Sequence, residues 1–295
     1  VSPTPFQAGQ TMGTVHGVSL KYVLLSVSAG AVARTVVHGS AAEESVRWPQ
    51  LILLLLLMHV CLVNGLLAVL VNFGVGMGIL GKHAATGTVP LWSYLLFAGF
   101  HAPNWLYTRL QHLADQRRRL PAASEVAPGW WVGGRYAAEL DRHWAGTVDL
   151  TCEFPEGCMA SSAEYLLLPC WDGTPPKPEE IDRAALFAVS ARADGDVIVH
   201  CAHGRGRSTT VMCACLVKAG LHADWEAAFE AVRSRRQVVR LNKGMRNALT
   251  GWQAEYAVST PKRAAAELPG CNSEVTTSRA SGLLRRMRTL LKRAL

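Results

Sequence analysis

The stretch from Asp196 to Val217 constrains the fold of this 295-residue chain most strongly. It begins with the β-branched run 197–199, which predicts a short buried strand. A loop with two glycines follows, and the apolar run 208–217 is long enough to form a core helix. A strand, a tight loop and a helix N-terminus together make an anion site, because unpaired backbone N–H groups and the helix dipole converge there.

The residues of this loop suit phosphate chemistry on a cysteine nucleophile. Cys201 stands where the strand ends, and N–H donors at a helix N-terminus lower a cysteine pKa from about 8.5 to below neutrality. Arg207 returns beside the sulfur at the first helical turn, and its planar guanidinium can bind two phosphate oxygens. Gly204 and Gly206 let the backbone turn its N–H groups inward. Ser208 can donate to the sulfur and help it leave.

Residues 200–208 read His-Cys-Ala-His-Gly-Arg-Gly-Arg-Ser, which resembles the HCxxGxxR(S/T) signature of the cysteine-dependent protein tyrosine and dual-specificity phosphatases. The resemblance covers about residues 126–258. It implies a phosphocysteine intermediate on Cys201, with no metal and no other cofactor. It also implies that the loop binds the substrate phosphate through Ala202, His203, Gly204, Arg205, Gly206 and Arg207. The alternative is a buried cysteine in a glycine-rich turn. A nucleotide loop is disfavoured, because the third glycine of a dinucleotide fingerprint and a Gly-Lys-Ser/Thr run are both missing.

Asp172 is the predicted proton donor for the leaving group. Phosphoester cleavage needs a proton delivered to the departing oxygen by a carboxylic acid on a loop that can close over the site. Asp172 lies 29 residues before Cys201, on a Gly- and Pro-bounded loop after the strand-like run 165–169. In the resembled family the acid aspartate sits on such a loop at about that distance. The alternative is that Asp172 only caps the helix that follows.

The eight cysteines predict free thiols rather than a metal site. No CxxC pair has a partner pair, so a zinc site is not expected. A thiolate enzyme needs a reducing compartment. Cys152 resembles the cysteine with which phosphatase-and-tensin-type lipid phosphatases trap the oxidised nucleophile as a disulfide, and this resemblance makes it a possible redox partner of Cys201. An ordinary buried cysteine is the alternative.

Strand-like runs at 130–134, 147–151, 165–169 and 197–199 alternate with helical ones. This alternation predicts an α/β domain with a central, mostly parallel sheet flanked by helices. The resemblance implies that the domain has the dual-specificity-phosphatase fold.

A charge-free stretch precedes this domain and predicts a membrane region at 51–108. Residues 51–80 contain no Asp, Glu, Lys or Arg, and about 20 apolar residues suffice to span a bilayer. Residues 89–107 have Trp and Tyr near both ends and predict a second span, with an interfacial helix as the alternative. Together they predict a transmembrane helical hairpin. Arginines at 109 and 117–119 predict that the following domain faces the cytosol or its organellar equivalent.

The remaining segments complete the domain organisation. Residues 1–50 form a poorly defined N-terminal segment, 109–125 a basic linker and 126–258 the phosphatase domain. The tail, 259–295, ends in a basic amphipathic run at 281–295, which predicts a helix on a membrane surface. A helix that binds a partner's groove and a solvated tail are the alternatives. Nucleic acid is not an expected partner, because no base-stacking aromatic residues accompany the basic ones.

The chain is therefore predicted to be a membrane-anchored phosphatase of phosphate monoesters, most simply a dual-specificity (Tyr/Ser/Thr) protein phosphatase. A phospholipid phosphatase, acting on a phosphoinositide or phosphatidylglycerolphosphate, is the alternative, since the hairpin and tail would hold the site against a bilayer. Arg205 and His203 would add cations for an anionic head group, although Ala202 stands where the resembled inositide-lipid enzymes carry lysine. A catalytically inactive phosphate-binding membrane scaffold is the third hypothesis.

Overall fold

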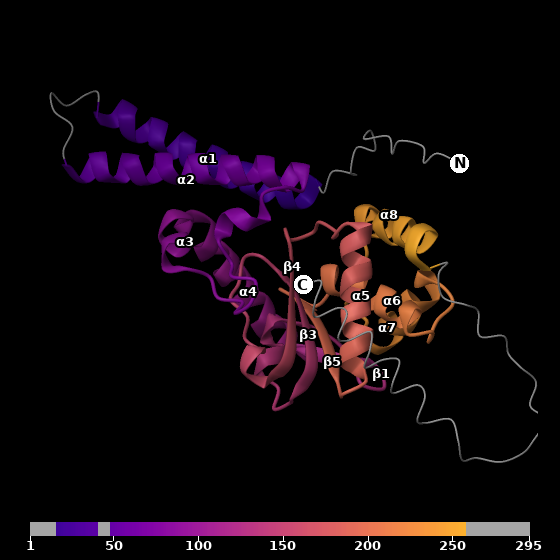
Figure 1. Cartoon of the computed structure of the whole chain (residues 1–295). Coiled ribbons are helices and arrows are strands. Elements are labelled where there is room, and N and C mark those ends of the chain that lie inside the picture. Colours follow the sequence, from indigo (N-terminus) through magenta and orange to yellow (C-terminus); the bar gives the residue numbers. More distant parts are fainter. Residues whose placement is uncertain (1–15, 41–47, 258–295) are drawn as a thin grey trace, which may run out of the picture.

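The computed structural model describes residues 16–40 and 48–257. It places an α/β domain beside a pair of long apolar helices, which project to one side of it (Figure 1). The predicted tail helix at 281–295 lies outside the described residues.

A five-stranded sheet in the order β1-β2-β5-β3-β4 forms the centre of the domain. The first strand pairs antiparallel with the second, and the remaining pairs are parallel, which confirms the predicted mostly parallel α/β sheet. The strands are β1 (Ala123–Ala127), β2 (Trp130–Gly134), β3 (Trp144–Thr151), β4 (Ser162–Cys170) and β5 (Val197–Cys201). Every residue of β5 is buried, as expected for a strand with neighbours on both sides.

Four helices of the domain follow the predicted pattern: α5 (Pro178–Arg192), α6 (Arg207–Lys218), α7 (Trp225–Arg235) and α8 (Lys243–Trp252). Residues 207–217 of α6 are all buried, because this helix packs against β5 and against the helices on either side of it. Its N-terminus therefore points at the end of β5 from within the core. A π-helical turn (Gln253–Ala257) ends the described part of the chain, and short 3-10 helices occupy Met77–Leu80, Arg135–Glu139 and Met159–Ser161.

The apolar hairpin consists of α1 (His16–Ser40) and α2 (Trp48–Phe73), which pack along each other (Figure 1). Among the described residues, 19–39 and 48–73 are the segments long and apolar enough to cross a membrane. The partner of α2 is therefore α1, from the segment that the sequence left poorly defined. The expected span at 51–80 ends earlier than predicted, at Phe73, where the chain turns through left-handed glycines at 74 and 76.

The expected second span at 89–107 differs from the structure. It is divided between α3 (Leu91–Leu96) and α4 (Ala98–Arg117), and its polar side chains face protein. His101 is buried and bonds Ser93 at 3.1 Å, while the side chain of Asn104 accepts from Lys21 of α1 at 3.4 Å.

The expected basic linker at 109–125 also differs, because α4 and β1 occupy most of it and α4 packs on the α/β domain. The indole of Trp105 lies against Phe154 with ring centroids 5.6 Å apart, and Asp115 forms an ion pair with Arg205. The hairpin is thereby joined to the domain through structured helices.

A buried ion pair fixes the turn after α2 to the sheet. The ammonium of Lys82 pairs with Asp149 of β3, and their side chains are 2% and 0% exposed. Lys82 also donates to the carbonyl and hydroxyl oxygens of Thr151, both at 2.9 Å, and Tyr165 donates to Asp149 at 3.1 Å. Every polar atom of the pair thus has a partner suited to its charge, which a buried pair requires.

We expect Lys82→Met to destabilise the protein strongly, because it leaves the Asp149 carboxylate buried without its cation. Removing one partner of such a pair costs about 3–5 kcal/mol. The measurement is the midpoint of thermal unfolding of the detergent-solubilised chain. Arg233→Ala is the control, because it breaks a 3.7 Å pair with Glu230 in which both side chains are more than half exposed. A midpoint for Lys82→Met as close to the wild type as that of the control would contradict the role given to Lys82.

Candidate active site

The loop between β5 and α6 is shaped by close backbone packing at Gly204. This residue has φ +65°, and a Cβ on it would lie 2.3 Å from the carbonyl carbon of Gly133 on β2. His203 forms an isolated bridge with Gly134 beside it. Position 204 therefore requires glycine for two reasons: its backbone is left-handed, and it lies too close to β2 for a side chain.

Cys201 lies at the centre of this loop and is 3% exposed. Its sulfur is 3.4 Å from the hydroxyl of Ser208, and the backbone N–H groups of His203 and Ser208 also donate to it. Burial alone raises the pKa of this thiol, but the Arg207 guanidinium and these donors outweigh it and hold the pKa below the ordinary value. The site therefore favours a thiolate.

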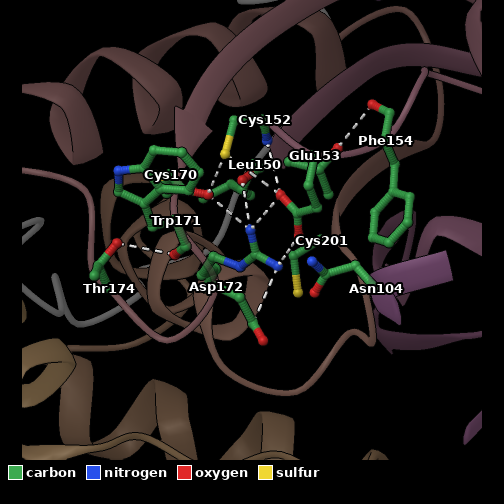
Figure 2. A network of polar contacts seen from close by, with 12 residues as sticks. Asn104, Leu150, Cys152, Glu153, Phe154, Cys170, Trp171, Asp172, Thr174 and Cys201 are labelled. Carbon is green, nitrogen blue, oxygen red and sulfur yellow. Dashed lines mark hydrogen bonds and ion pairs between the residues drawn. The ribbon is translucent and has the colours of Figure 1, made fainter. Parts of the chain in front are cut away.

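Arg207 is 1% exposed and is held on three sides by Leu150, Glu153 and Cys170, the acceptors that Figure 2 labels. Glu153 binds it at 2.8 and 3.2 Å, and the carbonyl oxygens of Cys170 and Leu150 accept from it at 2.8 and 3.2 Å. Its Nε has no partner among the described residues. A buried guanidinium fixed in this way leaves one donor free for an incoming anion.

Asp172 contacts the same guanidinium, as Figure 2 shows, with its Oδ1 3.2 Å from Arg207. Its Oδ2 lies 3.8 Å from the ammonium of Lys21, a residue of α1. Burial raises the pKa of this carboxyl, but the charges of Arg207, Lys21 and His203 outweigh burial and lower it. Helix α5 begins at Pro178 with Lys177 as its N-cap, so Asp172 does not cap that helix.

The loop that carries Asp172 is fastened to the segment after α2. The indole of Trp171 donates to the carbonyl of Val75 at 2.7 Å, and its ring meets Phe100 edge-on at 6.1 Å. Thr174 donates back to the Trp171 carbonyl at 2.9 Å. Segments that precede the sheet thus hold one side of this loop, and Asn242, which donates to the carbonyl of Gly173 at 2.8 Å, holds it from the N-terminus of α8.

Arg236 holds the phosphate-binding loop from behind. It is 5% exposed and donates to the carbonyls of Gly204 at 2.8 Å and His203 at 3.4 Å. It also donates to the carbonyl of Pro121 and the hydroxyl of Ser124, next to and within β1. Carbonyls fixed on the outer side of the loop leave its N–H groups available on the inner side.

Two predicted cations of the loop are not free. The guanidinium of Arg205 forms a two-oxygen ion pair with Asp115 of α4, at 2.7 and 2.8 Å. Burial lowers the pKa of His203, whose ring packs edge-on against Tyr107. Neither side chain therefore offers a free positive charge. The sequence had predicted that both would supply cations for an anionic lipid head group, and the structure differs from that prediction.

Cys152 is fully buried and lies beside the Arg207 cluster. Its sulfur donates to the carbonyl of Cys170 at 3.4 Å and lies 3.5 Å from Glu153. Burial and the Glu153 charge raise the pKa of this thiol. All cysteines of the described residues are free. A disulfide between Cys152 and Cys201 stays a prediction.

His200, the first residue of the signature, is an ion-pair residue. Its Nε2 lies 2.7 Å from Glu156, and the charges of Glu156 and Asp149 outweigh burial and raise its pKa to about 9. Glu156, Cys158 and His200 form the one group with metal-ligand chemistry in the part of the chain that the structure describes. Glu156 is already engaged by His200 and by the N–H of Cys158.

Sequence reasoning missed three residues of this site: Glu153, Arg236 and Lys21. Glu153 follows the carboxyl end of a predicted strand, the edge where functional side chains of parallel sheets gather, and that position is a usable signal. Arg236 carries no local signal, because its partners are backbone carbonyls distant in sequence. Lys21 lies in the N-terminal segment that the sequence leaves poorly defined, and no motif there indicates a contact with Asp172.

Comparison with known proteins agrees with this site. Residues 164–255 match the family model described as dual specificity phosphatase, catalytic domain. The matched range includes the loop that carries Asp172 (the acid loop), the loop between β5 and α6 (the predicted phosphate-binding loop) and helices α5 to α8. The match supports the dual-specificity phosphatase family for this part of the chain.

Among curated proteins, the mouse dual specificity protein phosphatase 12 is 32% identical over 152 residues, covering 47% of this chain and 43% of that protein. The dual specificity protein phosphatase 5 of Rattus norvegicus is 29% identical over 167 residues, covering 54% and 42%. The chain thus spans less than half the length of these relatives. Among solved structures, a mouse putative dual specificity phosphatase complexed with zinc tungstate covers 46% of this chain and 92% of its own, with TM-score 0.41 and 24% identity.

We expect Gly204→Ala to abolish phosphatase activity and lower stability, because the added methyl would force the loop away from β2. Gly220→Ala is the control: it has φ +74° and open space around its Cβ position. The control isolates backbone strain, which costs about 1–2 kcal/mol, whereas Gly204→Ala adds a backbone clash. The measurements are unfolding midpoint and turnover of p-nitrophenyl phosphate. Full activity in Gly204→Ala would show that the loop does not need this packing.

Proposed function

We propose that this chain is a membrane-anchored, cysteine-based phosphatase that hydrolyses phosphate monoesters through a phosphocysteine intermediate. The observation that carries the proposal is the buried guanidinium of Arg207, which Glu153 holds, whose Nε has no partner among the described residues and whose charge lowers the pKa of Cys201. The family match to the catalytic domain supports the same activity.

In the first step, the Cys201 thiolate attacks phosphorus and the bond from phosphorus to the ester oxygen breaks. The Arg207 guanidinium and the loop N–H groups bind the three non-bridging oxygens, where charge is spread in the transition state. Asp172 in its acid form donates a proton to the departing oxygen, so the alcohol leaves neutral.

In the second step, water attacks the phosphocysteine. The Asp172 carboxylate accepts the proton of that water, phosphate leaves, and the sulfur returns to the thiolate. Ser208 donates to the sulfur at 3.4 Å and stabilises it as a leaving group.

The first step needs a protonated Asp172, although its carboxyl has a lowered pKa in the empty site. A bound phosphate dianion places negative charge beside this carboxyl and occupies Arg207, the strongest of its cations. Both changes raise the pKa of Asp172, so substrate binding itself favours the acid form.

A phosphorylated protein is one candidate substrate, since the named relatives are dual specificity protein phosphatases. A phospholipid is the second candidate, favoured by the contacts of the acid loop with both ends of the apolar hairpin. We place the hairpin in the membrane and the catalytic domain on the cytosolic side or its organellar equivalent. A catalytically inactive phosphate-binding scaffold is the outcome if no monoester is hydrolysed.

We expect Cys201→Ser to abolish turnover and Asp172→Asn to reduce it by about 10²–10⁴-fold. The Asp172→Asn loss should be larger for an alkyl or tyrosyl phosphate than for p-nitrophenyl phosphate, because nitrophenolate leaves without a proton. In the wild type, kcat/KM should fall as pH rises through the lowered pKa of Asp172, and Asp172→Asn should remove that fall. The exposed carboxylate Asp141 supplies the control, Asp141→Asn. Equal losses for good and poor leaving groups would contradict the acid role.

A further inference from the structure

We propose that the substrate of this site is a phosphomonoester on the head group of a membrane lipid, and that Lys21 is a specificity-determining residue that contacts its leaving group. This inference rests on the phosphatase activity proposed above. It starts from the position of Lys21 on α1, whose ammonium lies next to the Asp172 carboxylate and not between the two helices of the hairpin.

The leaving group must lie beside Lys21, because its ester oxygen has to be within reach of the proton donor Asp172. Asp172 has to reach that oxygen, and the Lys21 ammonium is 3.8 Å from Asp172. The two side chains are 35% and 32% exposed, whereas Cys201 and Arg207 are almost fully buried. The site therefore opens along the Asp172–Lys21 pair, and the alcohol part of the substrate lies in that opening.

The same opening lies at the depth of lipid head groups. Lys21 belongs to the first turn of the candidate span at 19–39, and Val75, which accepts from Trp171, lies two residues after α2 ends. The acid loop is thus held between the two open ends of the hairpin. When the hairpin crosses the bilayer, its ends lie at the membrane–water interface, and the acid loop lies there with them.

The surface of α1 next to Lys21 suits an acyl chain. Residues three and four positions apart are neighbours on a helix, so Leu24 and Leu25 lie one turn from Lys21. Leu24 is 57% exposed, and the preceding Leu20 is 52% exposed. A cation at the base of an exposed apolar helix pairs with an anionic head group while the chains of the lipid lie along the helix.

A phosphopeptide fits this opening less well. Its backbone would lie against the exposed leucines of α1, which offer it no hydrogen bonds. The lipid is the substrate class that satisfies both the cation and the apolar face.

The test uses the full chain reconstituted in phosphatidylcholine vesicles. Substrates are phosphatidylglycerolphosphate and phosphatidylinositol monophosphate in the same vesicles, their deacylated water-soluble counterparts, a phosphotyrosine peptide and p-nitrophenyl phosphate. We expect kcat/KM for at least one lipid to exceed that of its deacylated form and of the peptide by more than about tenfold. We expect Lys21→Gln to lower the ratio of lipid to p-nitrophenyl phosphate turnover by about 10–100-fold, the worth of one charge-assisted hydrogen bond.

Two variants separate recognition from folding and from general loss of charge. Lys21→Arg keeps the cation and should retain the ratio. Arg34→Gln removes the other exposed cation of α1, more than three turns away, and should leave the ratio unchanged. A higher kcat/KM for the peptide than for every lipid, or an unchanged ratio in Lys21→Gln, would overturn the inference. If wild-type protein fails to hydrolyse even p-nitrophenyl phosphate, the proposed phosphatase function itself is wrong.

Discussion

The ion pair between Arg207 and Glu153 is the interaction on which the site depends. A guanidinium buried at 1% exposure is tolerated only because the carboxylate and two carbonyl oxygens satisfy it. Fixed there, its charge lowers the pKa of Cys201 and engages Asp172. One cation thus acts on both the proposed nucleophile and the proposed acid, and the backbone N–H groups of His203 and Ser208 add further donors to Cys201.

The apolar hairpin is part of this arrangement rather than a separate anchor. Lys21 from α1 reaches the acid, and the chain after α2 accepts from Trp171 and sends Lys82 into the buried pair with Asp149. Because residues of the apolar hairpin and Trp171 share one cluster of buried apolar residues, the hairpin helps to fix the loop that carries Asp172. This coupling supports the proposed lipid substrate.

The sequence was informative where the chemistry is local. Cys201, Arg207 and the strand and helix around them lie within a few residues of each other, so local spacing and the family signature together predicted their roles. Glu153, Arg236 and Lys21 reach the site through contacts between distant segments, and no periodicity reports such contacts. The same limit explains why the hairpin was predicted with the wrong partner. The apolar content of 89–107 predicted a span, but the polar residues of this segment pack on protein. In the structure α1 is the helix that pairs with α2.

The central claim is that Cys201 is a thiolate at neutral pH because Arg207 and main-chain donors surround it. The most direct measurement is the rate of iodoacetamide alkylation of the Cys201-containing peptide against pH, followed by mass spectrometry in the folded protein. We expect a midpoint below the ordinary thiol value of about 8.5, and a higher midpoint in Ser208→Ala, which removes one donor. A wild-type midpoint at the ordinary value would show that Arg207 and the main-chain donors do not activate this cysteine.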